Sequence, residues 1–443
     1  MPGKLKSSIL TSRVFNPRSP FSPEVAMARG IYECVNCGHR EVFESGEPLL
    51  EKACPKCGSD MLLVGFAEGE GQDNVPQIEA FAPPKLPHDV EEKLRQFYAL
   101  EFEGVDGNLF IYEVKEIIEN DFERVLRELE ELGYWAALKK RGKRVLLFVF
   151  PAQEVKESNP WLPWVFLIAT IFTTFMAGYY QALLYIEFLD IFNLPGLRNP
   201  YLIALSFSVS VMAILGTHEM GHKIAAVYHG VKATVPYFIP FPNIIGTMGA
   251  LIRVKSPIPT RNAAIDLGAS GPIAGFLVAI PVTIIGMKLS VAVPQGAIPP
   301  TEGGITLGTN LFFYLLGKYL FPIPDGYVLY LHPVAMAGWV GILVTFLNLI
   351  PAAQLDGGHI ARAFLSERAH RYFTMVLGFL LIALGFLWVG WMIWAVLILF
   401  MGSMGNPGAL DEVSPISKKR IALAVAALVI FILSATPVPF SAS

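Results

Sequence analysis

The residues best suited to chemistry lie in the segment Gly-Thr-His-Glu-Met-Gly-His at 216–222. His218 and His222 are four residues apart, so a helix places both imidazoles on one face, where they can share a metal ion. Glu219 follows the first histidine and is placed to act as general base toward a water that the metal activates. The segment lies in an apolar run over 201–228 that is long enough to span a bilayer, where ionisable side chains are costly. The pattern indicates a hydrolytic zinc site inside a membrane rather than a chance pairing of histidines.

A catalytic zinc site usually has a third protein ligand and keeps one position open. The best candidate is Asp356, in the segment Asn-Leu-Ile-Pro-Ala-Ala-Gln-Leu-Asp-Gly-Gly-His at 348–359. Pro351 is expected to interrupt the preceding helix, and the two glycines after Asp356 allow backbone to approach metal or substrate closely. Asn348 could donate its amide to the oxyanion of a tetrahedral intermediate. The alternative is that Asn348 and Asp356 are ordinary helix-end residues at a membrane interface.

A second candidate metal site lies near the N-terminus. The four cysteines of the chain form two CxxC pairs separated by 16 residues: Cys34, Cys37, Cys54 and Cys57. Each pair can turn back so that four thiolates surround one ion, which predicts a zinc ribbon whose structural zinc has no open position. Two disulfides or a rubredoxin-like iron site are the alternatives, and a cytosolic location disfavours the disulfides.

The composition predicts a membrane protein with soluble domains. Apolar residues make up 53% of the chain and charged residues 16%, and nearly all long apolar runs follow Trp161. We expect spans near 162–184, 201–228, 264–288, 332–352, 372–388, 389–404 and 420–436, with a further interfacial or half-spanning helix within 306–320. The fold class expected is therefore a multi-span α-helical membrane protein with a cytosolic N-terminal zinc ribbon and a small α+β domain.

The chain divides into five expected parts. They are an N-terminal tail (1–29), the zinc ribbon (30–67), a linker rich in Gly, Pro and acidic residues (68–87), the small α+β domain (88–155) and a polytopic membrane metalloprotease domain (160–436). Within the α+β domain we expect a helix over 88–100, a strand over 108–114, a helix that begins after Asn120 or Asp121 and stops at Gly133, and a hairpin of 135–139 with 144–150.

The placement of Lys and Arg predicts the orientation. They gather in the loop after the second span, after the fourth span and before the last one, while the opposite side carries only Arg198, Lys288 and Lys318. We therefore expect a multi-pass protein of the cell membrane with its N-terminal domains in the cytosol. The tail over 1–29 lacks the apolar core of a signal peptide, and a net charge of −3 gives no reason to expect nucleic acid as a partner.

His-Glu-Met-Gly-His together with N-x-x-P-x-x-x-L-D-G over 348–357 resembles the site-2 protease family of intramembrane zinc metalloproteases, over about residues 160–436. The segments 246–259 and 266–276 and the pair His332-Pro333 agree with it. With the α+β unit before the first span, the chain is similar to the branch that includes plastid members. The resemblance implies that His218, His222 and Asp356 hold zinc, that Glu219 is the base, and that Asn348 lies near the scissile carbonyl.

The resemblance also implies a role for Gly246, Thr247, Met248 and Gly249. The segment is similar to a membrane-associated β-hairpin of the family, which would offer an edge to a substrate chain unwound into an extended form. The alternative is a polar loop folded over the site. The chain shows no recognisable PDZ domain and carries the ribbon as an addition, so regulation of PDZ-bearing members is not expected to apply.

The function expected is hydrolysis of peptide bonds in or near transmembrane segments, with one catalytic and one structural zinc, a transmembrane protein as substrate and the lipid bilayer as surroundings. A non-proteolytic scaffold or chaperone-like relative is one alternative, although it has no use for Glu219 as base. A transporter would be expected to show repeated halves, and none is visible. A membrane-anchored protease for soluble peptides would use the same residues. The sequence predicts neither the oligomeric state nor the physiological substrate.

Overall fold

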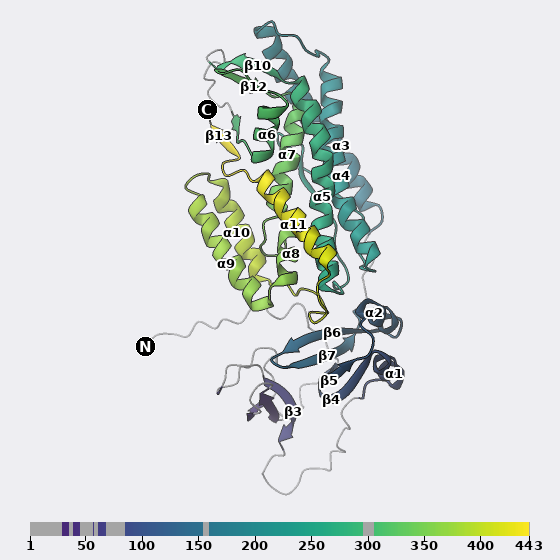
Figure 1. Ribbon diagram of the computed structural model, residues 1–443. Coiled ribbons are helices and arrows are strands. Elements are labelled where there is room, and N and C mark those ends of the chain that lie inside the picture. Colours follow the sequence, from purple (N-terminus) through teal and green to yellow (C-terminus); the bar gives the residue numbers. More distant parts are fainter. Residues whose placement is uncertain are drawn as a thin grey trace, which may run out of the picture. The chain divides into compact units, whose positions relative to one another are not determined.

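The computed structural model describes residues 29–34, 39–44, 56, 61–67, 85–153, 159–295 and 305–442 (Figure 1). The chain divides into two compact units. The N-terminal unit comprises Met1–Glu154 together with Leu410–Pro415, and the helical unit comprises Val155–Ala409 and Ile416–Ser443. The return of residues 410–415 to the N-terminal unit was not expected from the sequence.

The N-terminal unit contains two antiparallel sheets. The first has the order β2-β1-β3 and is formed by β1 (Arg29–Cys34), β2 (Arg40–Glu44) and β3 (Met61–Ala67). The second has the order β4-β5-β7-β6 and is formed by β4 (Tyr98–Asp106), β5 (Leu109–Ile117), β6 (Tyr134–Arg141) and β7 (Arg144–Pro151). The predicted hairpin around Gly142 is the β6–β7 pair.

Two helices pack apolar faces into the core of the second sheet. Helix α1 (His88–Phe97) contributes Val90, Leu94 and Phe97, and α2 (Phe122–Glu131) contributes its own apolar side. Asp121 caps α2, since its carboxylate accepts a hydrogen bond from the backbone N–H of Arg124 at 3.0 Å. The predicted helix over 88–100 was three residues too long. Residues 98–100 open β4 instead, because pairing with β5 satisfies their backbone groups.

In the helical unit, three helices are long and apolar enough to cross a membrane, among the residues described. They are α3 (Leu162–Ile191), α4 (Pro200–Tyr228) and α5 (Arg261–Leu289). Helix α4 packs between α3 and α5 (Figure 1). Asn199 caps α4 just before Pro200, and Thr260 caps α5, so each helix begins where a side-chain oxygen meets its free N–H groups. These spans make the chain a membrane protein.

Helix α7 (Pro333–Asn348) is the buried centre of this unit and packs on both α4 and α5. Its 16 residues rise about 24 Å, less than the hydrocarbon thickness of about 30 Å. The span predicted near 332–352 corresponds to α7, which ends four residues earlier. The chain leaves the helix at Leu349, two residues before Pro351, which cannot continue a helical ladder.

Shorter elements complete the helical unit. They are α6 (Leu311–Tyr319), α8 (Asp356–Phe364), α9 (Glu367–Leu384), α10 (Gly390–Ser403) and α11 (Lys418–Ser434), with strands β8 (Tyr237–Pro240), β9 (Thr247–Leu251), β10 (Val291–Pro294), β11 (Ile305–Leu307), β12 (Tyr327–Tyr330) and β13 (Phe440–Ala442). The strands pair as β8–β9, β10–β12 and β11–β13. The last three predicted spans correspond to α9, α10 and α11, and the helix expected within 306–320 is α6, preceded by a short strand.

Candidate metal centre

Three side chains from two helices meet at one point of the helical unit. His218 and His222 lie one turn apart on α4, and Asp356 is the first residue of α8. The Nε2 atoms of the two histidines are 3.1 Å apart, and each is 3.3 Å from Oδ2 of Asp356. Ligands of a tetrahedral zinc site, at about 2.0–2.2 Å from the metal, are about 3.3–3.6 Å from one another. Both distances to Asp356 lie at this spacing, and the two histidines are slightly closer to each other. The two imidazoles and one carboxylate therefore fit zinc and leave a fourth position open.

His222 is oriented by a backbone carbonyl. Its Nδ1 lies 2.6 Å from the carbonyl oxygen of Leu267 on α5, and because a carbonyl only accepts, Nδ1 carries the proton. In the neutral imidazole Nε2 then carries the lone pair, directed at the space it shares with Asp356 and His218, where a metal would bind. This is the arrangement that metal-ligating histidines use to fix tautomer and ring angle.

Asp356 is held by the turn that joins α7 to α8. Within it, Ala353 has a positive φ of 52°, its N–H donates to Oγ1 of Thr374 at 3.1 Å, and its carbonyl accepts from Nδ2 of Asn406 at 3.0 Å. A Cβ on Gly357 would lie 2.1 Å from the carbonyl oxygen of Leu349. We expected this glycine to let backbone approach metal or substrate, and the close approach found is to the turn itself. The turn is thus tightly folded, and Asp356 leaves it in a fixed direction.

The other two candidate catalytic residues lie beside these ligands. Asn348, the last residue of α7, places Nδ2 3.3 Å from Nε2 of His218. Glu219 is 6% exposed and accepts a hydrogen bond from the backbone of Ile252, just after β9. Asp356 keeps 19% of its side-chain surface exposed, so the cluster is not sealed. The Glu219 carboxylate, the Asn348 amide and a triad that could hold a metal therefore share one partly open site.

The hairpin that contains Gly246 to Gly249 is anchored on α3. Thr173 donates its hydroxyl to the carbonyl of Gly246 at 2.6 Å, and a Cβ on that glycine would lie 2.4 Å from Cα of Thr174. Thr247 is buried and donates to the carbonyl of Ile239, whereas Met248 is 66% exposed. The hairpin meets the candidate site through Ile252 and Glu219. The structure thus fixes one end of the segment and leaves Met248 accessible.

The cysteine site is not described to the same extent. Cys34 ends β1, while Cys37, Cys54 and Cys57 lie outside the described residues. The zinc ribbon therefore stays a prediction. In the part of the chain that the structure describes, His218, His222 and Asp356 are the group of ligand side chains close enough to hold a metal.

Two features of the site were not predicted. The hydrogen bond between the Leu267 carbonyl and His222 could not be predicted from the sequence, because every residue carries a backbone carbonyl. Asp266, beside it, forms ion pairs with His229 and Arg420, a residue 154 positions away. An ionisable residue within an apolar span was the available signal for Asp266.

Residues 206–384 match the model of peptidase family M50. The chain is similar to the rice (Oryza sativa subsp. indica) protein described as "Probable zinc metalloprotease EGY2, chloroplastic", with 31% identity over 237 residues that cover 52% of this chain and 42% of that protein. It is also similar to "Probable zinc metalloprotease EGY1, chloroplastic" of Arabidopsis thaliana, with 28% identity over 67% of this chain and 58% of that protein. The chain spans about half the length of the curated relatives it matches.

Among solved structures, the chain is similar to the site-2 protease from Methanocaldococcus jannaschii with 19% identity and a TM-score of 0.28, over 54% of this chain and 92% of that one. The family match and the zinc metalloprotease relatives confirm the resemblance that the sequence indicated for the membrane domain.

Proposed function

We propose that the protein is an intramembrane zinc metalloprotease that hydrolyses peptide bonds in or near transmembrane segments of membrane proteins. The observation that carries this proposal is the His218, His222 and Asp356 triad, with donor atoms 3.1–3.3 Å apart, beside the buried carboxylate of Glu219. The M50 match over 206–384 and the zinc metalloproteases among the relatives support the same reaction.

In this proposal each residue has a distinct task. His218, His222 and Asp356 would hold zinc, which supplies Lewis-acid activation of water and of the substrate carbonyl. Glu219 takes the proton of the attacking water and returns it to the leaving amine. Asn348 donates its amide to the oxygen that becomes negatively charged, as the 3.3 Å distance from Nδ2 to His218 favours.

The substrate would be bound in an extended form. A transmembrane helix uses its own carbonyls in hydrogen bonds, so a segment must unwind before a carbonyl can be attacked. Strand β9 pairs only with β8 among the described strands, which leaves one edge for a further strand. Gly246, Thr247, Met248 and Gly249 would form the start of this edge, and Ile252 at its end contacts Glu219. Residues that weaken a helix should therefore favour cleavage.

The number of zinc ions and the location of the protein are part of the same proposal. One zinc would be catalytic and one structural, the latter held by Cys34, Cys37, Cys54 and Cys57. The placement of Lys and Arg supports cytosolic N-terminal domains, and the membrane that we propose for this multi-pass protein is the cell membrane. The relatives compared are chloroplastic by name, which describes their compartment and not that of this chain.

The test is cleavage of a model membrane-spanning substrate by the purified full-length protein in lipid. Cleavage should lie within the apolar segment of the substrate and stop on chelation. Glu219→Gln should keep its zinc and lose at least about 10²-fold in rate, since a general base supplies 10²–10⁴-fold. Full activity of Glu219→Gln would remove the base from the mechanism. Zinc-loaded protein that cuts neither varied membrane substrates nor an unfolded soluble one would indicate a scaffold.

A further inference from the structure

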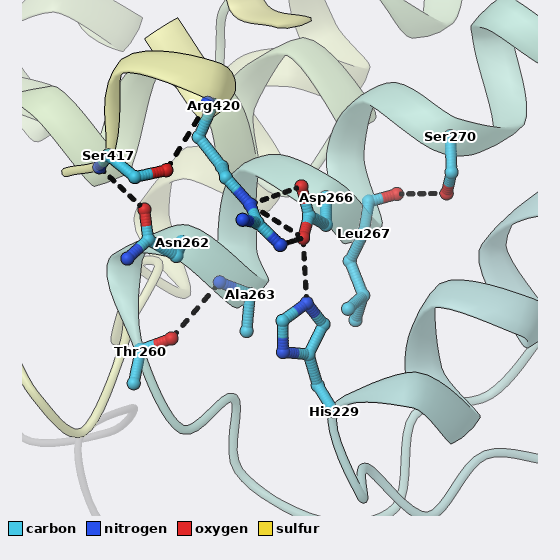
Figure 2. Close-up of polar contacts among 9 residues, drawn as sticks. All are labelled: His229, Thr260, Asn262, Ala263, Asp266, Leu267, Ser270, Ser417 and Arg420. Carbon is cyan, nitrogen blue, oxygen red and sulfur yellow. Dashed lines mark hydrogen bonds and ion pairs between the residues drawn. The ribbon is translucent and has the colours of Figure 1, made fainter. Parts of the chain in front are cut away.

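A charged cluster joins α4, α5 and α11 (Figure 2). The Asp266 carboxylate on α5 accepts from Nε2 of His229, at the C-terminal end of α4, at 2.8 Å. The same carboxylate accepts from Nη2 of Arg420 on α11 at 2.8 Å and from its Nε at 3.1 and 3.2 Å. The side chains of His229 and Asp266 are 3% and 16% exposed, so the cluster is largely withdrawn from water.

Helix α11 is tied to α5 at a second point one turn away. The backbone N–H of Ser417, which caps α11, donates to Oδ1 of Asn262 at 3.0 Å (Figure 2). Asn262 and Asp266 are four residues apart and thus lie on one face of α5. A buried ion pair contributes little net stability compared with apolar packing. An ionisable residue in an apolar span is therefore more simply explained by what it positions.

The cluster fixes how α4 and α5 lie against each other. The facing residues are His218 with Gly275, His222 with Gly271, and His229 with Asp266. Numbers rise along α4 as they fall along α5, so the two helices are antiparallel. The approach is close, because a Cβ on Gly271 would lie 2.1 Å from Nε2 of His222. A small slide of one helix along the other would therefore disturb the metal ligands.

Asp266 is followed directly by Leu267, whose carbonyl orients His222. In a helix side chains lean toward the N-terminus and carbonyls point toward the C-terminus. From neighbouring positions of α5, the Asp266 side chain thus reaches back to His229 while the Leu267 carbonyl reaches forward to Nδ1 of His222. Ser270 also donates to this carbonyl, at 3.3 Å (Figure 2). Anchoring the carboxylate therefore anchors the carbonyl.

We propose that Asp266 is a positioning residue for the metal ligand His222. Its ion pairs with Arg420 and His229 hold α5 in register with α4, which keeps the Leu267 carbonyl on Nδ1 of the ligand. The inference rests on the metal site of the proposed function and adds the residue that aligns it. Loss of the hydrogen-bond partner of a metal ligand lowers metal affinity by about 10–100-fold. The loss in Asp266→Asn should be near the lower end of this range, because the substitution displaces the Leu267 carbonyl without removing it.

The experiment measures the dissociation constant of zinc for the full-length protein, by competition with a chelator. Asp356→Ala identifies which binding step belongs to the catalytic site. Asp266→Asn and Arg420→Gln should each weaken that step by about tenfold and leave the other step unchanged. Arg198→Gln, which removes a guanidinium from an exposed ion pair with Asp190, is the matched control and should bind zinc like the wild type.

The double variant Asp266→Asn with Arg420→Gln separates positioning from stability. It leaves no charge uncompensated, so its thermal unfolding temperature should recover toward that of the wild type while zinc affinity stays low. If Asp266→Asn does not fold, this charge-neutral variant carries the test. Zinc affinity within twofold of wild type in the double variant, with the site still lost in Asp356→Ala, would overturn the inference alone. Unchanged zinc binding in Asp356→Ala would overturn the proposed metal site and the inference with it.

Discussion

At the residue scale, the proposed metal centre depends on the absence of a side chain at Gly271 as much as on the three candidate ligands. Gly271 faces His222 so closely that a Cβ would lie 2.1 Å from Nε2, the atom that would bind the metal. Gly317 in α6 is the opposite case, because a Cβ added there meets nothing within 4 Å. A side chain at Gly271 would collide with His222, whereas a side chain at Gly317 would collide with nothing.

We therefore expect Gly271→Ala to abolish zinc binding at the catalytic site and to lower the free energy of unfolding by about 1–3 kcal/mol, since an added methyl overpacks a filled space. Gly317→Ala should raise that free energy by about 0.5–1 kcal/mol, because alanine is the better helix former. Zinc titration and thermal unfolding in detergent measure both effects. Normal zinc affinity in Gly271→Ala would show that α4 and α5 can separate without loss of the site.

At the element scale, the turn between α7 and α8 positions Asp356. Ala353 lies in the left-handed region with φ of 52° and is buried, and its N–H and carbonyl are held by Thr374 and Asn406. The sequence predicted an interruption from Pro351, and the helix does end at Asn348. It could not predict the left-handed residue, because alanine rarely adopts that conformation. Tertiary hydrogen bonds impose it.

This turn gives a directional prediction. Ala353→Val should lower the free energy of unfolding by at least about 2 kcal/mol and weaken zinc binding, because a β-branched residue is strained at positive φ and overpacks a buried site. Ala353→Gly should keep its zinc, since glycine adopts this φ without strain. The two variants are compared by thermal unfolding and zinc affinity. If Ala353→Val and Ala353→Gly bound zinc equally well, the conformation of the turn would not determine the position of Asp356.

One edge of the second sheet is covered by a segment from far along the chain, a pairing that the sequence did not predict. In the order β4-β5-β7-β6, strand β6 is an edge strand, and residues 410–412 pair with it. Leu138 donates its N–H to the carbonyl of Leu410 at 2.9 Å and accepts from the N–H of Glu412 at 3.0 Å. Lys139 forms an ion pair with Glu412 at 2.8 Å. A segment far along the chain thus covers an edge that would otherwise be open to other strands.

Asp411 holds this segment in shape. Its side chain is 1% exposed, and Oδ1 accepts from the backbone N–H groups of Val413 at 2.8 Å and Ser414 at 3.0 Å. Asp411→Ala leaves both donors without this partner and should cost about 1–3 kcal/mol in the free energy of unfolding of the N-terminal unit. Asp411→Asn keeps a side-chain oxygen and should cost less. Denaturant unfolding of the full-length protein measures the difference, and equal stability of the two variants would argue against this role.

At the scale of the whole molecule, a contact could be predicted only where its residues are close together in the sequence. His218, Glu219 and His222 were identifiable because one helical turn brings them together, and the apolar runs marked α3, α4 and α5. The ion pair of Asp266 with Arg420 joins residues 154 positions apart, and no local pattern encodes it. Strand β4 was missed because it follows α1 without a breaker residue. Local periodicity thus predicts elements, whereas the contacts that align them require the fold.

The number of bound zinc ions tests the proposed organisation of the whole chain. A catalytic site and a ribbon are independent in sequence, so the purified protein should hold two zinc ions per chain, and Asp356→Ala should hold one. Changing Cys54 and Cys57 to serine should also leave one zinc, because the ribbon loses two of its four thiolates. Glu219→Gln should keep both, since its carboxylate is not a ligand. Elemental analysis after gel filtration gives these counts. One zinc in the wild type and none in Asp356→Ala would support the catalytic site and exclude a zinc ribbon. Two zinc ions retained in Asp356→Ala would show that Asp356 is not a ligand and would overturn the proposed triad.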